Sequence, residues 1–254
     1  MKQSKSFPTL PQNEDIPFFK NQDISDSFIR FKPLTDNQAI AMHYNADPEV
    51  RVLGLFGSAG TGKTALALNM ALADFIDGNC YQVKFIRNAV STRNIGALPG
   101  DESEKDAPYL QVVKNLTNEM FSVPGAYGVL SSDKNGTIKA GCSTFIQGET
   151  WNDCRVVVDE PQNMNWPELY MIMTRMGRNC KLYLSGDTRQ CMLNGKHDFG
   201  ALPELIHVLN MMQSARIVNF EIKDMVRDDV VAEFLTAVEK MSAMIDRDPE
   251  YMGD

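Results

Sequence analysis

Few residues in this chain suit a structural metal site or a disulfide framework. Among 254 residues there are five cysteines, an odd number, with no C-x-x-C pair, and three scattered histidines. Neither a disulfide scaffold nor a zinc ribbon follows from that pattern. Cys154 and Cys180 border apolar runs, so we expect both to be small core residues.

Long apolar stretches are also absent. No segment reaches the roughly 20 apolar residues of a membrane-spanning helix, and residues 1–20 lack the apolar core of a signal peptide. Positive charge is in deficit, since the formal net charge is -8, and the whole molecule therefore does not attract nucleic acid. We expect a cytoplasmic protein in which any nucleic-acid contact is local.

The size of the chain limits its domain organisation. With 43% hydrophobic residues it can bury the core of one α/β domain, but two complete nucleotide-binding domains do not fit. Residues 1–32 are polar and contain three prolines, which predicts an arm that is disordered or docked on a neighbour. Residues 33–246 form the predicted single domain, and residues 247–254 form a C-terminal tail.

Patterns typical of strands and helices alternate through this domain. Thr35 or Asp36 can cap a short helix over residues 37–44. The predicted strands cover residues 50–56, 81–87, 155–158, 181–184 and 215–220. The predicted helices cover residues 64–75, 106–121, 167–175 and 228–244. Asn135-Gly136 is a candidate hairpin turn. The alternation predicts an α/β fold with a mostly parallel sheet, helices on both faces, and ligands at the carboxyl ends of the strands.

A glycine-rich loop follows the first of these strands and opens a helix. It reads G-x-x-x-x-G-K-T and consists of Gly57, Ser58, Ala59, Gly60, Thr61, Gly62, Lys63 and Thr64. Glycines let the backbone curl and turn its N–H groups inward, and the helix N-terminus favours an anion there. We expect the loop to bind the ATP triphosphate, with Lys63 at the β- and γ-phosphates and the Thr64 hydroxyl on Mg²⁺. The strand-to-helix context disfavours the alternative, a chance match in a glycine-rich turn.

Two further strands end in polar residues with candidate catalytic roles. Asp159 and Glu160 follow the apolar residues 155–158, and we expect Asp159 to hold magnesium through water and Glu160 to polarise the attacking water. A helix cap is the alternative for this acidic pair. Gln190 follows Asp187 beyond the next strand, where it can contact the γ-phosphate or the attacking water. Without the other motifs, that segment would be read as a turn.

Additional motifs resemble those of a known family. One segment matches R…G-x-L-P-G-D…K…P-Y-L, with Arg87, Gly96, Leu98, Pro99, Gly100, Asp101, Lys105 and Pro108-Tyr109-Leu110. The block around Asp159-Glu160 and Gln162-Asn163, and the later Val226-Arg227, are similar too. Over residues 33–240 the chain resembles the PhoH-like ATPases of bacteria and phages, which are related to superfamily 1 helicases.

The resemblance implies a RecA-type P-loop core that hydrolyses ATP with Mg²⁺. It further implies binding or remodelling of RNA or single-stranded DNA, as in an RNA helicase, and a homo-oligomeric ring such as a hexamer. Gln38, in an Asn37-Gln38 pair that fits the family's adenine-reading element, would contact adenine. The setting would be the cytoplasm of a bacterium or of a phage-infected host cell.

The chain also departs from the family pattern. Where relatives typically have R-G-R-T, it reads Gln147-Gly148-Glu149-Thr150, so two cations are absent and an acid replaces one of them. Asp228 stands in place of a histidine after Arg227, and Pro161 in place of a small residue. These changes weaken the expectation of nucleic-acid binding. A nuclease-like second domain is also missing, so we predict no ribonuclease activity.

A single domain does not reveal which part of the protein supplies a catalytic arginine. An arginine at the γ-phosphate speeds hydrolysis strongly, and here it must fold back in cis or come from a neighbouring subunit. Arg227 and Arg175 are the candidates, in that order. The alternative for each is a surface salt bridge.

Local basic residues give the nucleic-acid hypothesis its limited support. They are Lys84, Arg87, Arg93 and Lys105 around the L-P-G-D segment, and Lys134 and Lys139 beside the candidate turn. Asp101, Glu102, Glu104 and Asp106 lie close to these basic residues in the sequence, so a solvated surface is an alternative of at least equal weight. Other functions to be separated by experiment are a small-molecule kinase, and a module that binds ATP only to assemble rings. A GTP switch lacks its N-K-x-D motif.

Overall fold

Six parallel strands form the centre of the protein, in the order β3-β2-β4-β5-β1-β6. The computed structural model describes residues 22–88, 107–132, 136–143, 148–187, 201–226 and 229–247. The strands are β1 (Val52–Gly57), β2 (Gln82–Arg87), β3 (Ile138–Gly141), β4 (Cys154–Asp159), β5 (Lys181–Gly186) and β6 (Ala215–Phe220). Strand β5 separates β1, which leads into the glycine-rich loop, from β4, which ends at the acidic pair.

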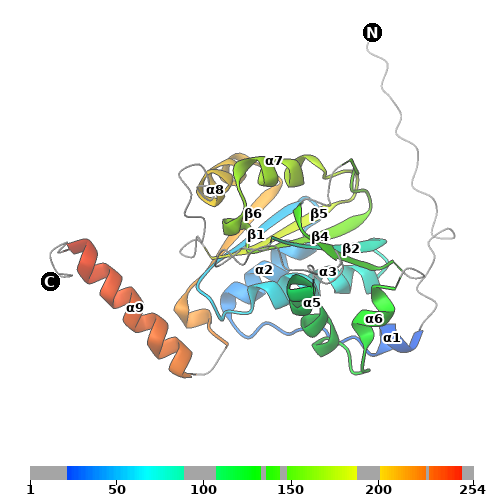
Figure 1. The fold of residues 1–254 in the computed structure, drawn as a ribbon, viewed down its shortest axis with the longest axis horizontal. Helices are drawn as coiled ribbons and strands as arrows, with labels where there is room; N and C mark the ends of the chain where they lie inside the picture. Colours follow the sequence, from blue (N-terminus) through cyan, green and yellow to red (C-terminus); the bar gives the residue numbers. More distant parts are fainter. Residues whose placement is uncertain are drawn as a thin grey trace, which may run out of the picture.

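Helices cover both faces of the sheet (Figure 1). Along the chain they are α1 (Gln22–Asp26), α2 (Asp36–Ala46), α3 (Lys63–Ile76), α5 (Ala107–Glu119), α6 (Ala126–Leu130), α7 (Trp166–Thr174), α8 (Leu202–Met211) and α9 (Asp229–Arg247). Two short 3-10 turns, η2 (Pro161–Asn163) and η3 (Ile222–Asp224), follow β4 and β6. Helices α7 and α8 lie on one face, α2, α3 and α5 lie on the other, and α9 extends away from the body. None of the described helices is both long enough and apolar enough to cross a membrane.

The strands are buried on both faces because successive side chains point to opposite sides of a strand. On the α3 face, Leu53, Leu55 and Val157 pack with α3 residues such as Leu68. On the opposite face, a second cluster joins strands to α7 and α8, with Val52, Val156, Val158, Leu182 and Leu184 against Leu169, Ile172, Leu202, Leu205 and Leu209. Cys154 and Cys180 belong to this second cluster and are buried, as expected.

The predicted strands and helices are confirmed, with boundaries that differ by a few residues. Thr35 caps α2, because its hydroxyl accepts the Gln38 N–H. Strand β3 and helices α1, α6 and α8 are absent from the elements that the sequence predicts. The hairpin prediction is wrong as far as the described residues show: Asn135 lies outside them, and β3 after Gly136 pairs in parallel with β2 rather than turning back.

The chain segment before α2 packs on this domain's own core. Ile24 is buried, and Phe28 packs against Phe121. The buried Asn69 side chain in α3 holds the backbone on both sides of Arg30, since it accepts the Phe31 N–H at 3.0 Å and donates to the Ile29 carbonyl at 2.9 Å. Residues 24–31 therefore belong physically to the domain, and the domain limits expected from the sequence stay a prediction. The rest of the expected arm, residues 1–21, and residues 248–254 lie outside the described residues.

Candidate nucleotide site

The glycine-rich loop crosses the carboxyl end of β1 against the last residue of β6. Gly57 has φ 130°, and a Cβ at this position would lie 1.9 Å from the Phe220 carbonyl oxygen. That oxygen accepts the Ser58 N–H at 3.1 Å. Gly62 has φ 77° and is the N-cap of α3. Only glycine adopts these conformations without strain, so the sequence pattern sets the sharp curve of the loop and the start of the helix.

The Lys63 ammonium lies inside the curve of the loop. It donates to the carbonyl oxygens of Gly57 at 2.9 Å and Ser58 at 2.6 Å, and the residue is only 8% exposed. Burial lowers the pKa of Lys63, while the nearby charges of Asp187, Glu160 and Asp159 oppose that shift. The Lys63 side chain is therefore held inside the loop by the carbonyl oxygens of Gly57 and Ser58.

Three strands bring their final polar residues into one row. The parallel register pairs Arg87 with Asp159 and Asp159 with Ser185. The Thr64 hydroxyl lies 2.7 Å from Asp159 Oδ1 and 2.9 Å from Ser185 Oγ. Two hydroxyls and a carboxylate therefore meet at the first turn of α3, and such oxygen atoms are the ligands that Mg²⁺ prefers.

Arg87 is a site residue that the sequence argument assigned elsewhere. Its Nη1 lies 2.6 Å from Asp159 Oδ2, and the Asp159 residue is only 1% exposed. Burial raises the pKa of Asp159, while the Arg87 charge and the Thr64 and Arg87 hydrogen bonds oppose that shift. Ser185 was missed too. The signal that could have found both is their position as polar residues at the carboxyl ends of apolar strands.

Glu160 adopts a conformation that few non-glycine residues take. Its φ is 55°, in the left-handed region, and Pro161 follows it. The buried Gln162 amide donates to the Glu160 carboxylate, and its oxygen accepts the Asp187 N–H at 3.2 Å. Burial and the charge of Asp159 raise the pKa of Glu160. Gln162 thus connects the acidic pair to the end of β5.

The adenine candidate, Gln38, contacts the phosphate loop directly. Its Nε2 donates to the Thr61 carbonyl at 3.2 Å, and its Oε1 accepts the Leu34 N–H at 2.8 Å. One N–H and one lone pair of the amide are still free of these two bonds. Beside it, the Val226 N–H donates to the Gly60 carbonyl at 3.2 Å, so the segment after β6 is attached to the same loop.

The structure does not bring the remaining predicted site residues into this cluster among the residues that it describes. Gln190 and Arg227 lie outside the described residues. Arg175 follows the last residue of α7, whose nine residues run back about 13 Å from the carboxyl edge of the sheet. Its carbonyl accepts the Trp151 N–H at 2.8 Å. A folded-back role for Arg175 in cis does not fit that position, and a role from a neighbouring subunit stays a prediction.

In this parallel sheet the loop follows β1, the acidic pair follows β4, and β5 lies between the two strands. That arrangement defines a P-loop nucleotide-binding domain with a RecA-like core. A family profile described as "PhoH-like protein" matches residues 30–239. The chain therefore belongs to the PhoH-like family.

Individual relatives agree with this assignment. The "PhoH-like protein" of Bacillus subtilis (strain 168) is 30% identical over 215 residues, which cover 84% of this chain and 65% of that protein. The "PhoH-like protein" of Mycobacterium leprae (strain TN) is 31% identical over 198 residues, covering 75% and 54%. The chain thus spans less than two thirds of the length of these relatives. Among solved structures, the Hef helicase domain of Pyrococcus furiosus has a TM-score of 0.44 and 14% identity, covering 72% of this chain and 37% of that one.

Proposed function

We propose that this protein hydrolyses ATP in the presence of Mg²⁺. The observation that carries the proposal is the contact between the Thr64 hydroxyl and the Asp159 carboxylate at 2.7 Å, which joins the phosphate loop to the acidic strand. The residues fit both groups: the loop offers backbone amides and the Lys63 ammonium to phosphates, and Thr64, Asp159 and Ser185 offer oxygen atoms to a hard cation. Magnesium would neutralise charge between the β- and γ-phosphates.

The proposal assigns roles to residues of the cluster and also to Gln190, which lies outside the described residues. Lys63 binds the β- and γ-phosphates, and Gly57 to Thr64 cradle the triphosphate through their backbone. Thr64 and Asp159 hold the metal, and Glu160 accepts a proton from the attacking water. Gln190 senses the γ-phosphate, and Gln38 contacts adenine with the free donor and acceptor of its amide. The water-activating position of Glu160 favours hydrolysis over phosphoryl transfer to a small molecule.

The test is ATP turnover and nucleotide binding by three proteins. Wild type should bind ATP–Mg²⁺ and release phosphate. Lys63→Ala should lose binding, and Glu160→Gln should bind normally but turn over at least about a hundredfold more slowly. Absence of ATP binding by wild type, or equal binding by Lys63→Ala, would overturn the proposal. Full activity of Glu160→Gln would leave nucleotide binding without a catalytic role for that carboxylate.

We infer that Arg227 supplies positive charge to the γ-phosphate of its own chain. Its chain neighbour Val226 donates to Gly60 in the phosphate loop, and adjacent Cα atoms are only about 3.8 Å apart. The Val226 contact thus favours action in cis for Arg227, whereas Arg175 can act only from another subunit.

Self-association and nucleic-acid binding complete the proposal. Helix α9 projects from the body with Val230 69% and Phe234 65% exposed, and a second copy in a ring would cover such apolar side chains. The test is the oligomeric mass with and without ATP, and a monomer in both conditions would contradict a ring.

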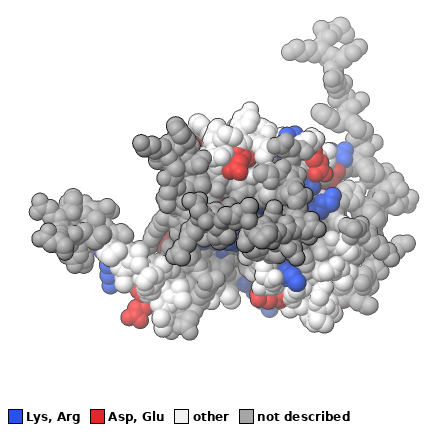
Figure 2. All heavy atoms as spheres, in the orientation of Figure 1, with Lys and Arg blue, Asp and Glu red and all other residues white. Residues whose placement is uncertain are grey.

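For RNA or single-stranded DNA, binding must be local: in the view of Figure 2 the described lysines and arginines are scattered and form no continuous patch. Coupling is tested by turnover with and without single strands at two salt concentrations, and a lack of stimulation and of binding at low salt would refute it.

A further inference from the structure

Two lysines stand side by side on neighbouring strands, away from the nucleotide cluster. In the register of β2 and β3, Lys84 pairs with Lys139. Strands at this spacing place paired residues about 5 Å apart, and like charges in such a pair repel each other. A negative charge nearby would offset the repulsion between these two lysines.

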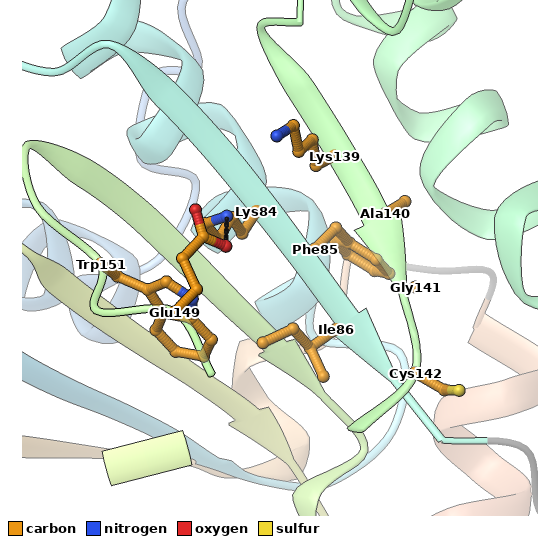
Figure 3. Close-up of a pocket in the computed structure, with 9 residues that line it drawn as sticks. All are labelled: Lys84, Phe85, Ile86, Lys139, Ala140, Gly141, Cys142, Glu149 and Trp151. Atoms are coloured by element: carbon orange, nitrogen blue, oxygen red, sulfur yellow. Dashed lines mark hydrogen bonds and ion pairs between the residues drawn. The ribbon is translucent and has the colours of Figure 1, made fainter. Parts of the chain in front are cut away.

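The negative charge within the chain comes from Glu149. Its Oε2 lies 3.0 Å from the Lys84 ammonium, which also sits 6.0 Å from the centre of the Trp151 ring. Lys84 is 7% exposed, Lys139 is exposed, and the Glu149 side chain is 60% exposed. Figure 3 shows Glu149 reaching across to Lys84 with the indole beside it. Among the described residues that line this place, two lysines accompany one carboxylate, so one positive charge is left over there in a chain whose net charge is -8.

These residues line a cavity rather than a packed surface. The pocket has a volume of about 290 Å³, and its walls come from Lys84, Phe85, Ile86, Lys139, Ala140, Gly141, Cys142, Glu149 and Trp151. Its walls therefore combine apolar side chains with the two ammonium groups. Because β3 is the terminal strand of the sheet, the pocket lies at the sheet edge, where a long ligand can continue past it. That size is at the lower limit of ligand pockets and suits a single nucleotide unit.

We propose that this pocket binds a phosphate group in the backbone of a single-stranded nucleic acid, and that Glu149 competes with that phosphate for Lys84. The phosphate takes the place of the carboxylate beside Lys84 and gains Lys139 as a second partner. Since the carboxylate is mostly exposed, it can move into water without leaving a buried charge behind. Removal of this carboxylate then strengthens binding, whereas removal of either lysine weakens it.

The pocket has a direct connection to the nucleotide cluster. Lys84 and Arg87 belong to the same strand and lie about 10 Å apart, and Arg87 contacts Asp159. A ligand that binds Lys84 therefore contacts β2, the same strand that positions Arg87. The ligand of this pocket rests on the nucleic-acid binding proposed above, and any effect of that ligand on hydrolysis rests on the proposed ATPase activity.

The experiment measures binding of a labelled single-stranded oligonucleotide, as RNA and as DNA, to the full chain at increasing salt. Glu149→Gln should bind several-fold more tightly than wild type at low salt, and Lys139→Met and Lys84→Met should bind more weakly. Each lost lysine contact should reduce the slope of log affinity against log salt by about 0.7. Lys114→Met is the matched control, because Lys114 is an exposed lysine of α5 on the opposite face of the sheet, and it should behave as wild type.

Three outcomes would overturn the proposal. One is unchanged affinity in Glu149→Gln, and another is equal affinity in Lys139→Met and Lys114→Met. The third is that inorganic phosphate binds to wild type but not to Lys139→Met, while neither oligonucleotide binds to wild type. That result would assign the pocket to a small phosphate ester. ATP turnover without nucleic acid is measured in parallel. Intact turnover in wild type, Lys139→Met and Glu149→Gln separates a failure of this proposal from a failure of the ATPase assignment.

Discussion

The Arg87 guanidinium lies 2.6 Å from the Asp159 carboxylate and fixes the side of Asp159 that faces away from Thr64. One carboxylate oxygen binds the Thr64 hydroxyl, and the other binds Arg87. Asp159 has almost no contact with solvent, and Arg87 is the cation in direct contact with its buried charge. This arginine therefore belongs to the nucleotide cluster, although its position in the sequence placed it among candidate contacts to nucleic acid.

Replacing Arg87 with methionine should destabilise the protein by about 3 kcal/mol, because it leaves a buried carboxylate without its counter-charge. Urea denaturation of wild type and Arg87→Met measures the loss. The matched test is the double variant Arg87→Met with Asp159→Asn, which has no charge to compensate and should recover most of the lost free energy of unfolding. Additive losses from the two changes would show that the ion pair contributes nothing of its own.

Gln162 should affect turnover but not nucleotide binding. Its amide holds the Glu160 carboxylate and also contacts the Asp187 backbone. In Gln162→Leu the carboxylate loses a charge-assisted hydrogen bond, and we expect kcat to fall by about tenfold or more. The dissociation constant of ATP–Mg²⁺ should stay near the wild-type value. Gln111→Leu, at an exposed glutamine that binds only its helix neighbour Asn115 among the described contacts, is the control. A change in binding as large as the change in kcat would contradict a positioning role.

Much of the fold could be predicted because its signals are local. The apolar runs of β1, β4 and β5, and the glycine loop before α3, are continuous in sequence. Strand β3 was missed because Ile138–Gly141 is short and carries a lysine and a glycine. Helix α8 was missed although Leu202, Leu205 and Leu209 have helical spacing.

Only part of the candidate site could be predicted, because some of its residues come together through strand pairing and do not form a contiguous motif. The loop and the acidic pair are contiguous motifs, whereas Arg87 and Ser185 reach Asp159 only through the pairing of β2, β4 and β5. Strand order and register depend on packing across the whole sheet, so a single sequence does not reveal them. The same holds for the contact between Val226 and Gly60, which joins residues far apart in the chain.

A mixing experiment separates action of Arg227 in cis from action in trans. Lys63→Ala lacks a working phosphate loop, and Arg227→Ala lacks the arginine. If Arg227 serves its own chain, every subunit in the mixture is defective, and turnover should stay as low as in each variant alone. If it serves a neighbour, a site with an intact loop from one variant and an intact arginine from the other recovers turnover. Recovery in the mixture would contradict the cis placement inferred from Val226, provided that both variants assemble as wild type does.

The buried thiol of Cys80 should make the protein less stable in alkaline solution. Burial raises the pKa of Cys80 from 9.0 to about 12. Between these values the unfolded chain has lost the thiol proton and the folded chain has kept it, so the unfolded state binds fewer protons and the free energy of unfolding falls as pH rises. From about pH 8 to about pH 10.5 this group alone should remove roughly 2 kcal/mol.

Urea denaturation at both pH values, for wild type and Cys80→Ala, isolates this contribution. Other groups that titrate at alkaline pH act equally in the two proteins, so the difference between their pH-dependent losses belongs to Cys80. Cys80→Ala is expected to start from lower stability, because a buried sulfur has been removed, but to lose less as pH rises. Equal losses in the two proteins would mean that the folded state gives up the thiol proton as easily as the unfolded chain does. The thiol of Cys80 would then be accessible to water in solution, contrary to the burial of this residue in the structure.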